Sequence, residues 1–184
     1  LVLFSLVRRA TSIVAPSMRC GAWLAFSIAL LWLVHPLQTE SVTYVIQRGE
    51  SMAALSILVV LLALLRGSRA TRPMPWYVIA VIAATLGMSS KATAAVIPPL
   101  AILFDGLVLS PSFRAALARR WWVHVALATS WIVLIPTGVF DAVFAPPEGE
   151  SAAVGFGVKT ITPLGYLAAQ PAVILHYLRL VAWP

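Results

Sequence analysis

Long apolar runs alternate with short polar segments along almost the whole chain. A helix needs about 20 mainly apolar residues to cross the hydrocarbon core of a membrane. Residues 1–7 read as the end of one span, and the sequence predicts further apolar segments at 17–34, 52–65, 76–109, 121–140 and 161–183. The 76–109 run is too long for one ordinary span, so we expect a helical hairpin with Lys91 at its tip.

These segments predict an all-α fold, a polytopic bundle of transmembrane helices. It would contain about five full spans, the N-terminal span remnant 1–7 and a C-terminal segment, 161–183. This last segment is amphipathic, and its pattern leaves open whether it spans the membrane, lies at the interface or dips partly into the bilayer.

Composition excludes several other classes of protein. Of the 184 residues, 61% are hydrophobic and only 10% are charged, with a mean hydropathy of +0.94. A soluble domain carries about 25% charged residues, so these few charges cannot cover a water-facing surface. The single cysteine, Cys20, excludes a disulfide scaffold.

The net charge of +7 is distributed unevenly. Segments 8–20, 66–75 and 110–120 hold nine Lys or Arg and no acid, whereas 36–51 and 141–160 hold two Lys or Arg and five acids. The two sets alternate with each crossing, as the positive-inside rule requires. We therefore expect a multi-pass protein of the bacterial cytoplasmic membrane, with the first three segments cytoplasmic and the other two extracytoplasmic, and no nucleic-acid partner.

The segment 36–51 has more polar chemistry than a simple connection needs. His35, Glu40, Arg48 and Glu50 fall within 16 residues. Arg48 is suited to clamping a phosphate through its planar guanidinium, and Glu40 to orienting a hydroxyl or a cation. The alternative is a solvated loop in which Arg48 pairs with a nearby Glu, and a His35 that only hydrogen-bonds backbone at a helix end.

Lys91 is the most specific single candidate. If its helix begins at Trp76, fifteen residues at about 1.5 Å each reach about 22 Å. This is shorter than a core of about 30 Å, so the ammonium would lie below the membrane surface, facing a polar cavity or an anionic partner. The alternative is a displaced or tilted helix from which Lys91 snorkels to the interface.

Other polar residues lie farther along the chain. His176 and Arg179 are three residues apart on one helix face beside Tyr177, where they could bind a lipid phosphate or act as ordinary interfacial anchors. Asp105 is expected to cap a helix or pair with a basic loop residue, and His124 to be a core histidine. No paired-cysteine or His-x-x-His spacing and no phosphate-binding glycine loop is present, so no cofactor is identified and a metal requirement stays open.

Three motifs together resemble the transmembrane and tetratricopeptide-repeat (TPR) O-mannosyltransferase-like family, membrane glycosyltransferases of the GT-C superfamily. The first runs through residues 35–48 (HPLQTESVTYVIQR) and Glu50-Ser51, the second through 86–91 (LGMSSK), Pro99-Leu100 and Phe104-Asp105, and the third through Tyr166-Leu167, Gln170-Pro171, residues 173–180 (VILHYLRL) and Trp183-Pro184. The order and spacing of these motifs are similar to those of the family. The resemblance covers nearly the whole chain.

The resemblance implies that the intact protein is an inverting enzyme. Such enzymes transfer a sugar, often mannose, from a polyprenyl-phosphate donor to an extracytoplasmic acceptor, here a protein (Ser or Thr) or a glycan. The chain would then be part of the membrane domain. The first span and the acidic catalytic loop would precede Leu1, TPRs would follow Pro184, and this part alone would be inactive.

The resemblance also implies roles for residues. Lys91, Arg48 or Arg179 would stabilise the departing lipid phosphate, and His35, Glu40 and Glu50 would hold the sugar or the polar network. The family commonly has Glu after the loop lysine, whereas Ala92 stands here. Two alternatives remain, a non-catalytic membrane scaffold carrying TPRs and a polytopic transporter.

Overall fold

The computed structural model describes residues 1–36, 44, 47–137 and 163–182. The chain divides into two compact units, Leu1–Val133 and Leu134–Pro184, and each is described here by itself. All regular structure within the described ranges is helical, which confirms the predicted all-α class.

The first unit is a set of packed helices. In chain order these are α1 (Val2–Val14), α2 (Gly21–Val34), α4 (Arg48–Gly67), α5 (Met74–Ser90), η3 (Ala92–Val96), α6 (Ile97–Phe104), η4 (Asp105–Leu109) and α7 (Phe113–Thr129). Segment η5 (Ser130–Thr137) follows α7 across the boundary of the units, and α9 (Pro163–Ala182) belongs to the second unit.

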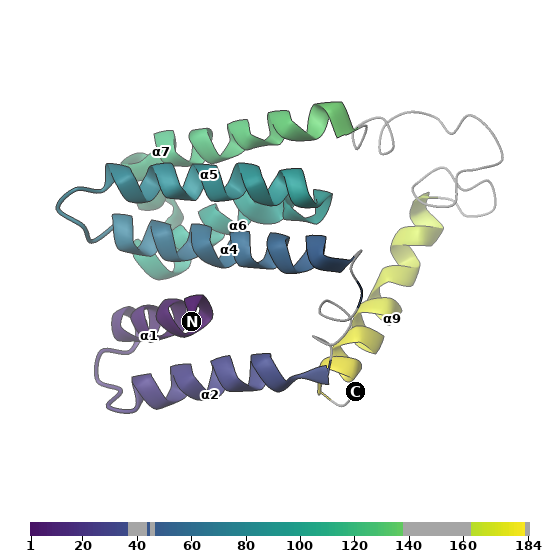
Figure 1. The fold of residues 1–184 in the computed structure, drawn as a ribbon, viewed down its shortest axis with the longest axis horizontal. Coiled ribbons are helices and arrows are strands. Elements are labelled where there is room, and N and C mark those ends of the chain that lie inside the picture. Colours follow the sequence, from purple (N-terminus) through teal and green to yellow (C-terminus); the bar gives the residue numbers. More distant parts are fainter. Residues whose placement is uncertain (37–43, 45–46, 138–162, 183–184) are drawn as a thin grey trace. The chain divides into compact units, whose positions relative to one another are not determined.

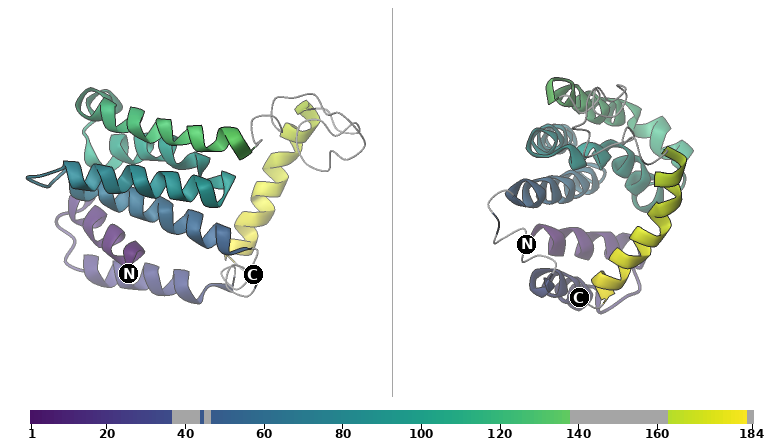
Figure 2. Two further views of the ribbon diagram at one scale, coloured as in Figure 1. Left: turned by 45° about the horizontal axis from the view of Figure 1, so that its top comes forward. Right: turned by 90° about the vertical axis from the view of Figure 1, so that its right-hand side faces the viewer.

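The helices α1, α2, α4 and α5, then the continuous stretch η3–α6–η4, and then α7 run in alternating directions (Figures 1 and 2). The α1–α2, α4–α5 and η4–α7 connections consequently lie at one end of this unit, and the α5–η3 turn lies at the other (Figure 1). We call the first the Arg end, because the segments 8–20, 66–75 and 110–120 meet there. The predicted 76–109 hairpin is confirmed, with Lys91 between α5 and η3.

Alanines share the interior of this unit with larger apolar residues such as Leu64, Met88 and Ile97, and many large apolar residues also lie on its outside. Eight alanines are buried at positions 25, 53, 63, 80, 84, 94, 101 and 116. By contrast Trp23, Leu31 and Leu86 are 74%, 66% and 60% exposed. Small residues let helices approach one another closely.

Two helical stretches in the described part of the chain are long and apolar enough to cross a membrane. They are Arg48–Gly67, with 20 residues, and Ala92–Leu109, with 18. The apolar helices Gly21–Val34 and Met74–Ser90 are shorter. Association with a membrane is therefore supported by these two helices.

Several predicted boundaries are wrong. Residues 8–14 are not a loop, because α1 continues through Arg8 and Arg9 to Val14. Arginine is a good helix former, and the first breaker is Pro16, which restricts the residue before it. The following helix begins at Gly21 and not near Ser17, because residues 15–20 are used to reverse the chain direction.

The other polar segments are also shorter than predicted. Helix α4 begins at Arg48, so Arg48 and Glu50 lie in its first turn, where an acid is favoured by the helix dipole. Helix α7 begins at Phe113 within the predicted loop 110–120, its first turn capped by the Ser112 hydroxyl. Its backbone is non-helical at Arg120, directly before the predicted start of the span at Trp121.

Candidate functional site

Two of the predicted site residues meet at the end of the first unit opposite the Arg end. Lys91 Nζ lies 2.5 Å from Glu50 Oε1, and the two side chains are 36% and 40% exposed. The Thr93 hydroxyl donates to Glu50 Oε2 at 3.3 Å. The hairpin tip and the first turn of α4 are thus joined by an ion pair that solvent can reach.

Gly49 lets these two elements approach. A Cβ at this position would lie 3.2 Å from the Ser90 carbonyl oxygen and 3.8 Å from Lys91 Cδ. This spacing is tighter than ordinary van der Waals contact, so a larger residue would push the hairpin tip away from α4. We define the Glu50–Lys91 end as Arg48, Glu50, Lys91 and Thr93.

Arg48 belongs to this end but has a different environment. It is the exposed first residue of α4. Among the ion pairs of the described residues, Glu50 is taken by Lys91 and not by Arg48. Pairing of Arg48 with a nearby Glu is therefore not seen for Glu50, and for Glu40, which lies outside the described residues, it stays a prediction. The Arg48 side chain is exposed, two residues from a carboxylate that Lys91 neutralises.

The remaining predicted site residues lie on other elements or outside the described residues. His35 is half-buried at the C-terminal end of α2, and Glu40 lies outside the described residues. His176, Tyr177 and Arg179 lie on α9 in the second unit, which confirms their helical spacing. All three are exposed, with the His176 and Tyr177 rings edge to face at 6.2 Å.

A second polar cluster, centred on the buried Asp105 carboxylate, lies near the Arg end. The Asp105 carboxylate accepts from Arg120 Nε at 2.8 Å and from Arg120 Nη2 at 2.5 Å. It also accepts from the Ser110 hydroxyl at 2.9 Å, and His124 Nε2 lies 3.0 Å away. The predicted pairing of Asp105 with a basic loop residue is confirmed, and so is a core position for His124.

Sequence reasoning did not predict that one carboxylate would join both Arg120 and His124. The four-residue spacing of Arg120 and His124 is the available sequence signal, although the backbone is non-helical at Arg120. His124 Nδ1 has no hydrogen-bond partner among the described residues. The Asp105 carboxylate accepts, so the Nε2 atom carries the proton of this contact.

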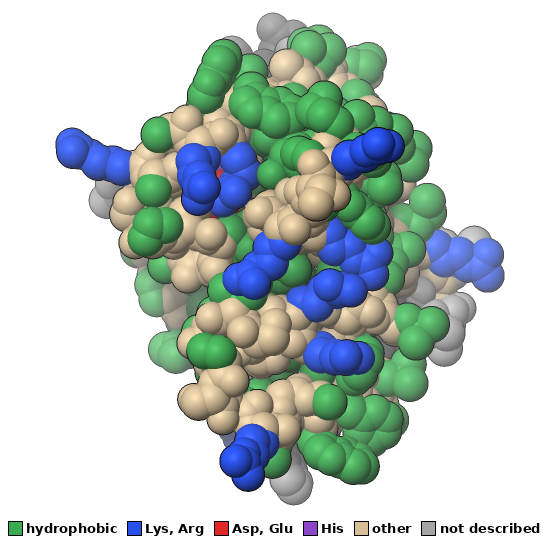
Figure 3. Space-filling view, turned by 90° about the vertical axis from the view of Figure 1, so that its left-hand side faces the viewer, with side chains coloured by type: hydrophobic (Ala, Val, Ile, Leu, Met, Phe, Trp, Pro, Cys, Tyr) green, Lys and Arg blue, Asp and Glu red, His purple; other side chains and the backbone are tan. Residues whose placement is uncertain are grey.

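The Arg end carries a concentration of positive charge. Figure 3 shows Lys and Arg side chains gathered on this face of the molecule. Exposed members are Arg8, Arg9, Arg19, Arg69, Arg72, Arg114 and Arg119. Three segments that are distant in sequence thus contribute to one basic surface.

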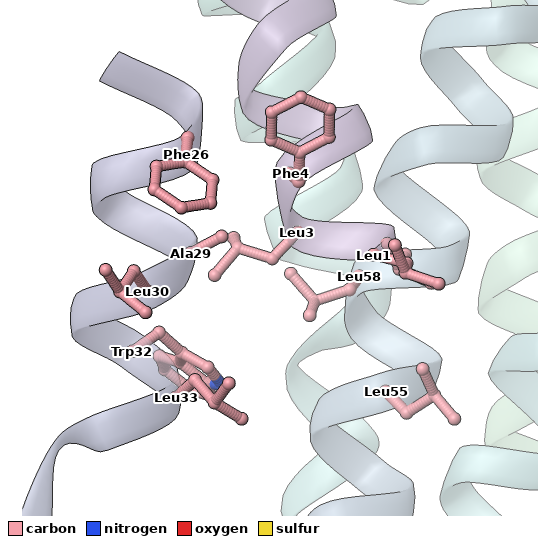
Figure 4. Close-up of a pocket in the computed structure, with 11 residues that line it drawn as sticks. Leu1, Leu3, Phe4, Phe26, Ala29, Leu30, Trp32, Leu33, Leu55 and Leu58 are labelled. Carbon is pink, nitrogen blue, oxygen red and sulfur yellow. The ribbon is translucent and has the colours of Figure 1, made fainter. Parts of the chain in front are cut away.

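An apolar cavity of about 730 Å³ opens between α1, α2 and α4. Leucine and aromatic side chains from the three helices face this common space (Figure 4). Leu55 and Leu58, which line it, stand on the same helix as Glu50. A chain-like apolar molecule fits such a lining better than a polar one does.

Neither the described side chains nor the comparisons identify a cofactor or a family. Within the described ranges, no three His, Cys, Asp or Glu side chains gather as metal ligands. Comparison with protein families, curated proteins and solved structures gives no match for this chain.

Proposed function

We propose that the chain is part of a GT-C-like membrane glycosyltransferase that uses a polyprenyl-phosphate sugar donor. The observation that carries the proposal is the contact between Glu50 and Lys91. Two of the three motifs behind the family resemblance contribute one residue each to this pair. Glu50 also contacts Thr93, which lies 43 positions farther along the sequence, so the same small site joins distant parts of the chain.

The chemistry of this end suits the release of a lipid phosphate. In the transfer, the acceptor oxygen bonds to the anomeric carbon, the bond from that carbon to the phosphate oxygen breaks, and the acceptor proton passes to a carboxylate base. The resemblance assigns this base to an acidic loop that precedes Leu1. Lys91 and Arg48 would stabilise the negative charge that grows on the departing phosphate.

Glu50 has a second role in this proposal. With no donor bound, Glu50 neutralises Lys91 and keeps the ammonium oriented. The ion pair contributes little to the stability of the protein, because both groups are more than a third exposed. A phosphate can then replace the carboxylate as the partner of Lys91 with little loss of stability. Glu50 takes the place that the family commonly gives to an acid directly after the lysine, where this chain has Ala92.

The membrane arrangement follows from the two ends. Arginine concentrates at one end, and the Glu50–Lys91 end lies opposite, on the side that the positive-inside rule makes extracytoplasmic. The alternating helices, with the shorter apolar α2 and α5 beside the two longer stretches, would form the polytopic bundle. The apolar cavity beside α4 would accept part of the polyprenyl chain.

The test is a transfer assay with radiolabelled mannosyl polyprenyl phosphate. The full-length natural protein is used in membrane vesicles, together with a peptide rich in serine and threonine and a glycan acceptor. We expect time-dependent passage of label from the lipid fraction to one acceptor. Label that stays on the lipid identifies a non-catalytic scaffold, and lipid-linked label that moves across the bilayer without transfer identifies a transporter; either result contradicts the proposal.

A further inference from the structure

A polar pocket at the Arg end has no role in the proposed transfer. It has a volume of about 440 Å³ and lies between the α4–α5 connection and the middle of α7. Its chemistry comes from Ser68, Arg69, Tyr77, Arg119, Arg120 and Trp122. Three arginines from two separate segments therefore converge on one concave site.

Two of these arginines bring uncompensated charge to the pocket. Arg120 forms its inner wall, and Asp105 neutralises it. Arg69 and Arg119 are exposed, and no ion pair among the described residues gives either of them a carboxylate. The pocket is thus complementary to an anion, and guanidinium groups match the geometry of phosphate oxygens.

An apolar groove lies beside this pocket, along α5 and α7. The groove has a volume of about 210 Å³ and shares Tyr77 and Trp122 with the pocket. The rings of these two residues pack edge to face at 5.2 Å. The rest of the groove is lined by Met74, Val78, Val81, Ile82, Val123 and Ala126 from α5 and α7.

The groove follows the helix axes away from the basic face. From Met74 to Ile82, eight successive rises of about 1.5 Å along α5 give about 12 Å of apolar wall. Val78 and Ile82 are 49% and 53% exposed, so the groove is open along its side. A polar anion site beside an open apolar groove has the amphipathic order of a membrane lipid.

We propose that this combined site binds an anionic glycerophospholipid. The phosphodiester lies between Arg69 and Arg119, with an acyl chain along the groove between α5 and α7. A free phosphate would use only the pocket and would leave the groove empty. The proposal needs the helical unit to lie in a membrane but does not depend on sugar transfer, since the site is at the end opposite Lys91.

Lipid binding by the full 184-residue chain tests this assignment. The chain is purified in detergent and titrated with phosphatidylglycerol, and bound lipid is counted by native mass spectrometry. We compare the double variant Arg69→Gln/Arg119→Gln with Arg72→Gln/Arg114→Gln. The control pair removes the same charge from the same two segments, but neither residue lines the pocket.

We expect the pocket pair to weaken phosphatidylglycerol binding about tenfold or more, because two charge-assisted contacts are lost. The control pair should change binding by less than about twofold. All four arginines are exposed, so both variants should keep the helical circular dichroism of the parent chain. Equal losses in the two pairs would indicate general attraction to the basic face and would overturn the site.

A soluble competitor separates a lipid site from a phosphate site. Glycerophosphoglycerol carries the same phosphodiester without acyl chains, so it should not displace phosphatidylglycerol at equal concentration. Inorganic phosphate should likewise fail. Displacement by either compound at equal concentration would show that the groove contributes nothing and would overturn the assignment to a lipid.

Discussion

Asp105→Ala is expected to lower the free energy of unfolding by about 3–5 kcal/mol, since removal of one partner from a buried ion pair leaves the other charge uncompensated. The Asp105 side chain is fully buried, and the side chain of Arg120 is 9% exposed. Ser110 and His124 would lose the same acceptor. Unfolding of the chain in mixed micelles with increasing SDS, followed by helical circular dichroism, measures the effect.

Glu50→Ala is the matched control for this variant. It also removes one carboxylate from an ion pair, but the pair is more than a third exposed, and exposed pairs contribute about 0–1 kcal/mol. The double variant Asp105→Ala/Arg120→Leu should be more stable than Asp105→Ala, because it no longer buries an unpaired cation. Equal effects of Asp105→Ala and Glu50→Ala would contradict a structural role for the buried cluster.

Lys91→Ala is expected to reduce sugar transfer by the full-length protein about 10²–10³-fold, the loss typical when one preorganised group is removed from a developing negative charge. Arg48→Ala should have an effect of the same order. Lys91→Arg keeps the positive charge and should retain much more activity than Lys91→Ala. Initial rates with radiolabelled mannosyl polyprenyl phosphate give these ratios.

The control for these variants is Arg72→Ala. It removes an exposed cation from the Arg end, far from the proposed donor phosphate, and should change transfer less than about twofold. Because Lys91 is partly exposed, its variants should unfold at nearly the same SDS fraction as the parent. Wild-type rates for both Lys91→Ala and Arg48→Ala would contradict the proposed roles.

The hydrophobic pattern was sufficient to predict the helical class and the hairpin around Lys91. The interruption Ser89-Ser90-Lys91 is a local feature, and the chain does turn there. The pattern predicts the ends of α1 and α7 poorly, because polar residues occur in helices as well as in loops. Arg8, Arg9 and Arg114 lie within helices, since arginine is compatible with a helix and only a breaker or a cap ends one.

The ion-pair partners of the charged residues are harder to predict from the sequence. The sequence predicts that Asp105 pairs with a basic loop residue, but its partner Arg120 stands where the α7 backbone is non-helical, which the sequence pattern does not reveal. The Glu50–Lys91 pair joins two motifs that sequence treats separately, and it needs the close approach at Gly49. Such contacts depend on the packing of α4 against the hairpin, which no local pattern encodes.

The arrangement of the two ends across a membrane is the claim on which the other proposals depend, and Cys20 offers a direct measurement. This cysteine is the only one in the sequence, and it is exposed in the α1–α2 connection at the Arg end. A membrane-impermeant maleimide is applied to spheroplasts that express the chain. The matched variant Cys20→Ser/Thr93→Cys carries its thiol at the Glu50–Lys91 end, where Thr93 is exposed.

We predict that intact spheroplasts label the Thr93→Cys variant and leave Cys20 unlabelled, and that permeabilisation makes both thiols reactive. Labelling of Cys20 in intact spheroplasts, with Thr93→Cys protected, would reverse the orientation and remove the Glu50–Lys91 end from the extracytoplasmic side. Protection or labelling of both thiols in intact spheroplasts would contradict placement of the two ends on opposite sides of the membrane.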